Sequence, residues 1–125
     1  MKIIRSGGTR LVILTKKYAI KLPRANTWKN FVQGMLSNIT EGQWKGYDNK
    51  FLCPIKYSNK FGLVVVMTRA RPVNHKGLFW IELERLYTYA SNEPQKLDKD
   101  FFEYDALPKN FGYYNGHLVK IDYGV

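Results

Sequence analysis

The sequence contains a single cysteine, Cys53, and no long apolar run within its 125 residues. One thiol cannot form an internal disulfide, so a reducing compartment is the expected setting. No stretch approaches the about 20 apolar residues that a membrane-spanning helix needs. The first residues also lack the apolar stretch of a signal peptide. We therefore expect a cytoplasmic protein with no membrane partner.

Acidic residues are scarce in the first part of the chain. Residues 1–76 contain 15 Lys or Arg but only Glu41 and Asp48, which gives 15 − 2 = +13. Residues 77–125 contain 5 Lys or Arg and 8 Asp or Glu, which gives 5 − 8 = −3. This asymmetry predicts a basic surface for nucleotide phosphates, for an acidic partner protein or for nucleic acid. For isolated charges, an ordinary solvated surface is the commoner explanation.

The remaining composition predicts one folded domain, since 45% of the residues are hydrophobic and 15% are aromatic. Apolar segments bounded by turn residues predict strands at 2–5, 10–15, 18–22, 51–57 and 61–67. The last of these is almost continuously apolar, so we expect it to be buried on both sides. Two further short strands are expected near the end of the chain, around a turn at 113–116.

Helical spacing of apolar residues predicts two helices, at 28–39 and at 79–90. Asn26 or Thr27 can cap the first helix. Together the elements predict an α+β fold, in which an antiparallel sheet of about five strands packs with one helix. One or two more helices, a loop and a closing β-hairpin then follow.

The most specific pattern lies in the last twenty residues. Asp105 and Asn110 stand five residues apart, and Asp122-Tyr-Gly follows after a strand-like segment. Asp and Asn are common turn formers on their own. Their oxygens are also the hard ligands that Mg²⁺ prefers, and phosphoryl transfer depends on placing such groups around phosphates. The combined pattern therefore indicates a phosphoryl-transfer site.

In this order, the motifs resemble the protein-kinase-like superfamily, which includes protein kinases and small-molecule phosphotransferases. In size the chain looks most like the very small kinase-like proteins of bacteriophages, which would place it in the host cytoplasm. The resemblance implies ATP and Mg²⁺ as cofactors, Asp105 as the base for the acceptor hydroxyl, and Asn110 and Asp122 as metal ligands. It also implies one compact domain over 1–125, with an N-lobe-like part at 1–70 and a reduced C-lobe-like part at 71–125.

The same resemblance assigns nucleotide-binding residues in the first part. Lys21, on the third predicted strand, matches the catalytic lysine that contacts the α- and β-phosphates. Gly7 and Gly8 resemble a shortened glycine-rich loop, although a plain hairpin turn explains them equally well. Met67 and Arg69 fall where the family's hinge offers backbone groups to adenine.

Glu41 is the candidate carboxylate for orienting Lys21, because it is the only acidic residue between Lys21 and Asp48. A continuous helix from Trp28 would turn Glu41 roughly 140–150° away from the apolar stripe. Two alternatives follow. Either the helix bends or restarts near Asn38, or Glu41 is simply exposed.

These expectations describe a minimal kinase-like protein that binds Mg-ATP and transfers phosphate to a Ser or Thr hydroxyl or to itself. Because the chain stops at Val125, we expect no platform for a peptide substrate. One alternative is a catalytically inactive kinase-fold protein that modulates an acidic host or partner protein through its basic face. A weaker alternative is a nucleic-acid-binding protein. The sequence leaves the oligomeric state open, with self-association as one option.

Overall fold

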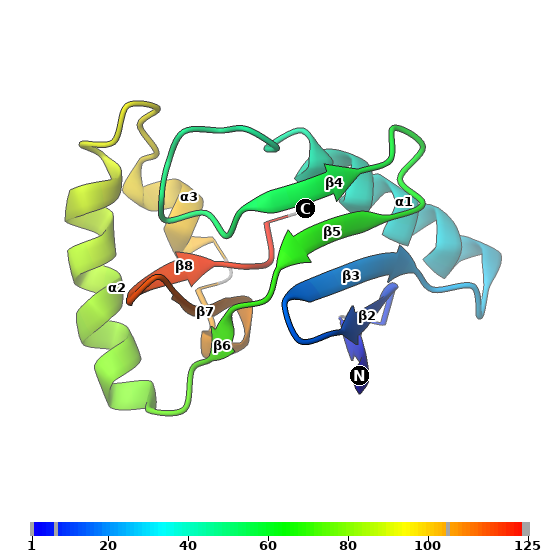
Figure 1. The fold of residues 1–125 in the computed structure, drawn as a ribbon, viewed down its shortest axis with the longest axis horizontal. Helices are drawn as coiled ribbons and strands as arrows, with labels where there is room; N and C mark the ends of the chain where they lie inside the picture. Colours follow the sequence, from blue (N-terminus) through cyan, green and yellow to red (C-terminus); the bar gives the residue numbers. More distant parts are fainter. Residues whose placement is uncertain (1, 7, 105, 124–125) are drawn as a thin grey trace. The chain divides into compact units, whose positions relative to one another are not determined.

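The computed structural model describes residues 2–6, 8–104 and 106–123 and has the predicted α+β class (Figure 1). The chain forms two compact units. Unit 1 comprises Met1–Gly46, Pro54–Arg69 and Tyr123–Val125, and unit 2 comprises Tyr47–Cys53 and Ala70–Asp122. The division predicted at residue 70 differs from this arrangement, because 47–53 belongs to unit 2 and 123–125 to unit 1.

Unit 1 is built on a five-stranded antiparallel sheet, as predicted, with the order β1-β2-β3-β5-β4. The strands are β1 (Lys2–Ser6), β2 (Arg10–Leu14), β3 (Tyr18–Pro23), β4 (Ile55–Ser58) and β5 (Val65–Thr68). The first three form a meander of neighbouring strands, and β5 pairs with β3 on one side and β4 on the other. The alternation of buried and less buried residues along β3 is typical of a sheet with one face against a core.

Two predicted strands are shorter than expected. β4 begins only at Ile55 and β5 only at Val65. Burial on both sides is wrong for the predicted 61–67 strand. Phe61 is 58% and Leu63 is 44% exposed, and within β5 the buried Val65 and Met67 alternate with the half-buried Val66. The reason is a turn before β5, in which Gly62 has a φ of 77° that favours glycine.

Helix α1 (Trp28–Gly42) packs against the sheet of unit 1. Thr27 caps it as predicted, because its side chain accepts the Asn30 N–H at 3.1 Å. Gly34 allows the close approach of helix and sheet. A Cβ at this position would lie 2.8 Å from the Cα of Pro23 and would also meet the Thr9 carbonyl oxygen.

The buried face of α1 is not the apolar stripe that the sequence suggested. Its buried residues are Gly34, Asn38 and Glu41, whereas Trp28 is 78% and Leu36 is 52% exposed. The helix runs without interruption to Gly42, and Glu41 is fully buried. A restart of the helix near Asn38 and an exposed Glu41 carboxylate are therefore both wrong.

Unit 2 combines helices with a three-stranded sheet of order β6-β7-β8. Its elements are β6 (Arg71–Pro72), α2 (Lys76–Ala90), α3 (Lys99–Glu103), the 3-10 turn η1 (Pro108–Asn110), β7 (Phe111–Tyr114) and β8 (His117–Lys120). The predicted second helix is confirmed as α2, which buries its apolar stripe of Phe79, Leu83, Leu86 and Ala90. None of the helices in the described part of the chain is long and apolar enough to cross a membrane.

The closing hairpin, β7–β8, turns at Asn115 and Gly116. Their φ angles of 52° and 80° lie in the left-handed region, which Asn and Gly tolerate best. The turn is therefore confined to two residues, since Tyr113 and Tyr114 belong to β7. Asn110 directly precedes β7 and Asp122 follows β8, so the two residues lie at the same end of this hairpin.

Candidate functional site

Lys21 and Glu41 form a buried ion pair within unit 1. The Lys21 Nζ lies 2.6 Å from the Glu41 Oε1. Lys21 comes from β3 and Glu41 from the last turn of α1. Lys21 is only 5% exposed and Glu41 is completely buried, so each depends on the other in place of water.

Two further donors reach the Glu41 carboxylate. The Arg10 Nη1 lies 3.2 Å from Oε1, and the backbone N–H of Tyr123 donates to Oε2 at 3.0 Å. Burial alone would raise the pKa of Glu41, but the charges of Lys21 and Arg10 and these hydrogen bonds outweigh it. The pKa of Glu41 is therefore lowered below its ordinary value. The carboxylate stays ionised at neutral pH.

Asn38 holds the surroundings of this pair in place. Its side-chain amide donates to the carbonyl oxygens of Lys21, at 3.1 Å, and Gly62, at 3.0 Å. Its Oδ1 accepts a hydrogen bond from Arg10 at 3.2 Å. We call Arg10, Lys21, Asn38 and Glu41 the Glu41 cluster. Sequence reasoning missed Arg10 and Asn38, although Asn38 stands three residues before Glu41 on the same helical face.

Unit 2 contains the predicted metal ligands, Asn110 and Asp122. Asn110 ends η1 and is buried, and its carbonyl oxygen accepts the Ile121 N–H at 2.9 Å. Asp122 directly follows Ile121. The β7–β8 hairpin therefore brings Asp122 back to the neighbourhood of Asn110. Asp105, the predicted base, lies outside the described residues.

Lys120 organises the segment that leads to residue 105. It is 3% exposed, and its Nζ donates to the carbonyl oxygens of Phe101, at 2.8 Å, and Tyr104, at 3.4 Å. The same ammonium lies 4.6 Å from the centre of the Phe101 ring, within the range of a cation–π contact. Sequence reasoning missed this residue, because a lysine on a strand usually reaches solvent.

The other predicted nucleotide-binding residues lie in unit 1. Gly8 has a φ of 79° and follows β1 in the turn towards β2, while Gly7 lies outside the described residues. Met67 is buried in β5, and Arg69 is exposed just after it. The backbone N–H of Arg69 donates to the Lys17 carbonyl oxygen at 2.9 Å. This N–H is therefore already hydrogen-bonded and would not bind adenine.

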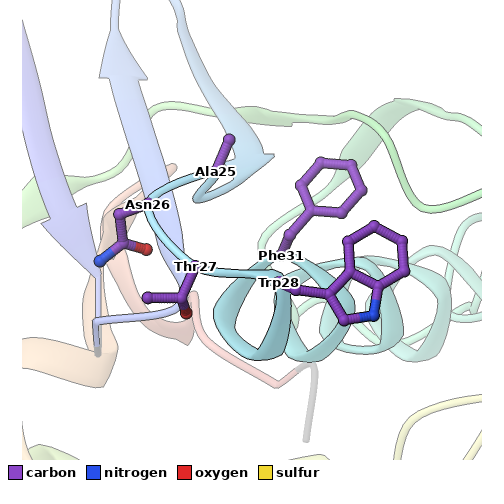
Figure 2. A pocket seen from close by; sticks show the side chains of 5 residues that line it. All are labelled: Ala25, Asn26, Thr27, Trp28 and Phe31. Atoms are coloured by element: carbon purple, nitrogen blue, oxygen red, sulfur yellow. The ribbon is translucent and has the colours of Figure 1, made fainter.

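A shallow cleft opens at the start of α1, and none of the predicted site residues lines it (Figure 2). It has a volume of about 390 Å³ and is lined by Ala25, Asn26, Thr27, Trp28 and Phe31. The Trp28 and Phe31 rings stack with their centres 6.0 Å apart. No ionisable side chain lines this cleft, so it offers stacking and apolar contact but no acid–base chemistry.

Mg²⁺ is compatible with the donor set of Asn110 and Asp122. An amide oxygen and a carboxylate are hard ligands, and Mg²⁺ usually combines one or two protein oxygens with phosphate oxygens and water. Within the described residues, no three His, Cys, Asp or Glu side chains gather into a metal-binding group.

Comparison of the chain with protein-family models, with curated proteins and with solved structures gave no match. The kinase-like resemblance therefore stays a prediction that depends on the residues themselves.

Proposed function

We propose that the protein binds Mg-ATP and acts as a minimal phosphotransferase. The observation that carries this proposal is the Glu41 cluster, in which a buried carboxylate holds the Lys21 ammonium at 2.6 Å. A lysine held in this way keeps its ammonium in a constant direction. A positive charge with a fixed direction suits the oxygens of a polyphosphate.

Stability alone is a weak reason to bury this many charges. Removing two ions from water is expensive, and well-packed apolar residues often replace a buried ion pair with no loss of stability. Unit 1 nevertheless buries Arg10, Lys21 and Glu41, each no more than 5% exposed. A functional need for an oriented ammonium explains the arrangement better than packing does.

In this proposal each predicted residue has one role. Lys21, oriented by Glu41, binds phosphate oxygens. Asn110 and Asp122 would hold Mg²⁺, which would neutralise phosphate charge when bound. Asp105 accepts the proton of the acceptor hydroxyl.

Calorimetric titration with Mg-ATP tests the binding step. We expect wild type to bind at submillimolar to millimolar ATP, and Lys21→Met and Asp122→Asn to weaken binding at least about tenfold, which corresponds to about 1.4 kcal/mol. Lys29→Met removes an exposed lysine of the same unit and should leave binding unchanged. Circular dichroism of each variant shows whether it is folded. Absence of wild-type binding at millimolar ATP would contradict the proposal.

Incubation with γ-labelled ATP, Mg²⁺ and a lysate tests the transfer step. Label should reach the protein itself or a lysate protein with wild type and should be lost with Asp105→Ala. If wild type binds ATP but transfers no label, the protein binds nucleotide without catalysis. If Asp105→Ala transfers label as wild type does, the role given to Asp105 is wrong.

A further inference from the structure

The face of the unit 1 sheet opposite to α1 carries a continuous apolar row. Residues that pair directly across antiparallel strands point to the same side of the sheet. The pairings Ile3–Ile13, Ile13–Ile20, Ile20–Val66 and Val66–Tyr57 therefore place one side chain from each of the five strands in a single line. We call these five residues the outer row.

The outer row is distinct from the face that α1 covers. Lys21 lies next to Ile20 on β3, and its side chain reaches Glu41 on α1. Neighbouring residues of a strand alternate between faces, so Ile20 points away from α1. Figure 1 shows α1 behind β4 and β5, consistent with this assignment.

The outer row is partly exposed. Ile3 is 60% and Tyr57 is 44% exposed, and Ile13, Ile20 and Val66 are half-buried. A solvated sheet face normally carries polar side chains that alternate with the buried ones. Five apolar residues in one line are instead typical of a sheet face that another apolar layer covers.

The charge of unit 1 defines what could cover this face. Its residues include twelve Lys or Arg and one acidic side chain, Glu41, so 12 − 1 = +11. Glu41 is fully buried, so it contributes no negative charge to the surface. Exposed cations belong to the same strands and their connections, namely Lys16, Lys17, Lys56 and Arg69. A second copy would bring +11 against +11, which opposes self-association through this face.

We infer that the outer row is a docking surface for an acidic, amphipathic helix of a partner protein. Four of the five side chains are aliphatic, and aliphatic groups gain most from contact with other apolar side chains. Nucleic-acid bases would instead need aromatic platforms, and Tyr57 is the only aromatic member. Five strands at about 4.8 Å spacing span about 19 Å, which a helix of about 13 residues covers.

A designed peptide can test this inference without knowledge of the natural partner. The probe is a fluorescent helical peptide of about 14 residues, with leucines along one face and glutamates elsewhere. Its control has the same composition but leucines distributed around the helix. We expect the protein to bind the probe at least about tenfold more tightly than the control. Methyl NMR shifts should appear at Ile13, Ile20 and Val66 and not at Ile39 of α1.

Matched substitutions in the two units show whether the probe peptide binds at the outer row. Ile3→Glu and Tyr57→Glu alter exposed ends of the outer row and should each weaken probe binding at least about tenfold. Ile81→Glu and Tyr89→Glu change the same residue types in α2 of unit 2, where Ile81 is 55% and Tyr89 is 58% exposed. These controls should leave probe binding within about twofold of wild type.

Several outcomes would overturn the inference. The first is that the protein does not bind the probe at about 0.1 mM. The second is that the control peptide binds as tightly as the probe. The third is that the unit 2 substitutions weaken probe binding as much as those of the outer row. Tighter binding of an oligothymidine that competes with the probe would assign the face to nucleic acid. A dimer in sedimentation that Ile3→Glu dissociates would assign it to a second copy. None of these readouts depends on ATP, so this inference and the proposed function can fail separately.

Discussion

The two units bury charged groups in opposite ways. Unit 1 buries an anion, Glu41, and surrounds it with Lys21, Arg10 and a backbone N–H. Unit 2 buries a cation, Lys120, and satisfies it with carbonyl oxygens of Phe101 and Tyr104 and with an aromatic ring. The first arrangement includes ion pairs, whereas the second includes hydrogen bonds from an ammonium to backbone carbonyl dipoles.

The two arrangements constrain their side chains in different ways. An ion pair with several cations fixes the direction of each side chain, and in unit 1 that orients Lys21. The hydrogen bonds of Lys120 instead join β8 to α3 at Phe101 and to Tyr104, which caps that helix. The comparison makes quantitative predictions, because the two arrangements should respond differently when a partner is removed.

The largest expected effect is that of Glu41→Gln. It removes the negative charge that the buried Lys21 and Arg10 share, so the free energy of unfolding should fall by about 3–5 kcal/mol. Urea denaturation followed by circular dichroism measures this loss. Glu103→Gln is the control, because Glu103 pairs with Lys99 at 3.3 Å on an exposed surface. The control should change stability by no more than about 1 kcal/mol. If the two substitutions lowered the free energy of unfolding equally, the importance given to the buried Glu41 carboxylate would be wrong.

Gly34→Ala should be the next most destabilising change. Its Cβ would meet backbone atoms of Pro23 and Thr9, which cannot move as a flexible side chain does. We expect a loss of about 2–3 kcal/mol, because helix and sheet must separate slightly. In unit 2, a Cβ at Gly77 would meet only the His75 side chain, at 3.2 Å. Gly77→Ala should therefore stay within about 1 kcal/mol of wild type in the same denaturation experiment.

Lys120→Met should have a smaller effect than Glu41→Gln. The methionine retains most of the apolar stem but loses the hydrogen bonds to Phe101 and Tyr104, so we expect a loss of about 2 kcal/mol. Urea denaturation gives the value. A loss as large as that of Glu41→Gln would show that the dipoles around Lys120 matter as much as the full charges around Glu41.

The smallest effect concerns the pH dependence of Tyr113 in unit 2. Burial, together with its hydrogen bond to Glu82 at 2.7 Å, raises the pKa of Tyr113 from 10.0 to about 12. Because the folded-state pKa is raised, this contribution to stability is present below pH 10.0 and is lost as the pH rises through about 12. Ultraviolet titration of tyrosinate should show one fewer late-titrating tyrosine in Tyr113→Phe. Glu82→Gln should lower the midpoint, and an unchanged midpoint would contradict the assigned cause.

The sequence predicted those elements whose local pattern matches their burial. Helix α2 is an example, because Phe79, Leu83 and Leu86 repeat at helical spacing and all face the core. The strands of the meander were predictable for the same reason, since turn residues separate short apolar segments. The hairpin at Asn115 and Gly116 also follows from local turn chemistry.

The buried face of α1 could not be predicted in this way. Asn38 and Glu41 are buried because their partners, Arg10, Lys21 and Gly62, come from strands and turns far away in sequence. Helical periodicity is defined by apolar residues, which in this segment form the stripe that contains Trp28. Polar burial is specified by tertiary contacts, and no local pattern reports them.

The hydrogen bond from Tyr123 to Glu41 also has a consequence for protein synthesis. It joins residues 82 positions apart, whereas Lys21 precedes Glu41 by 20. At about 5–20 residues per second, a ribosome delivers Tyr123 about 4–16 s after Glu41. The two cations of the Glu41 cluster are therefore synthesised before the carboxylate, and the backbone donor is added seconds after it. The hydrogen bond from Tyr123 can form only after that residue has left the ribosome, so it completes the surroundings of Glu41 late.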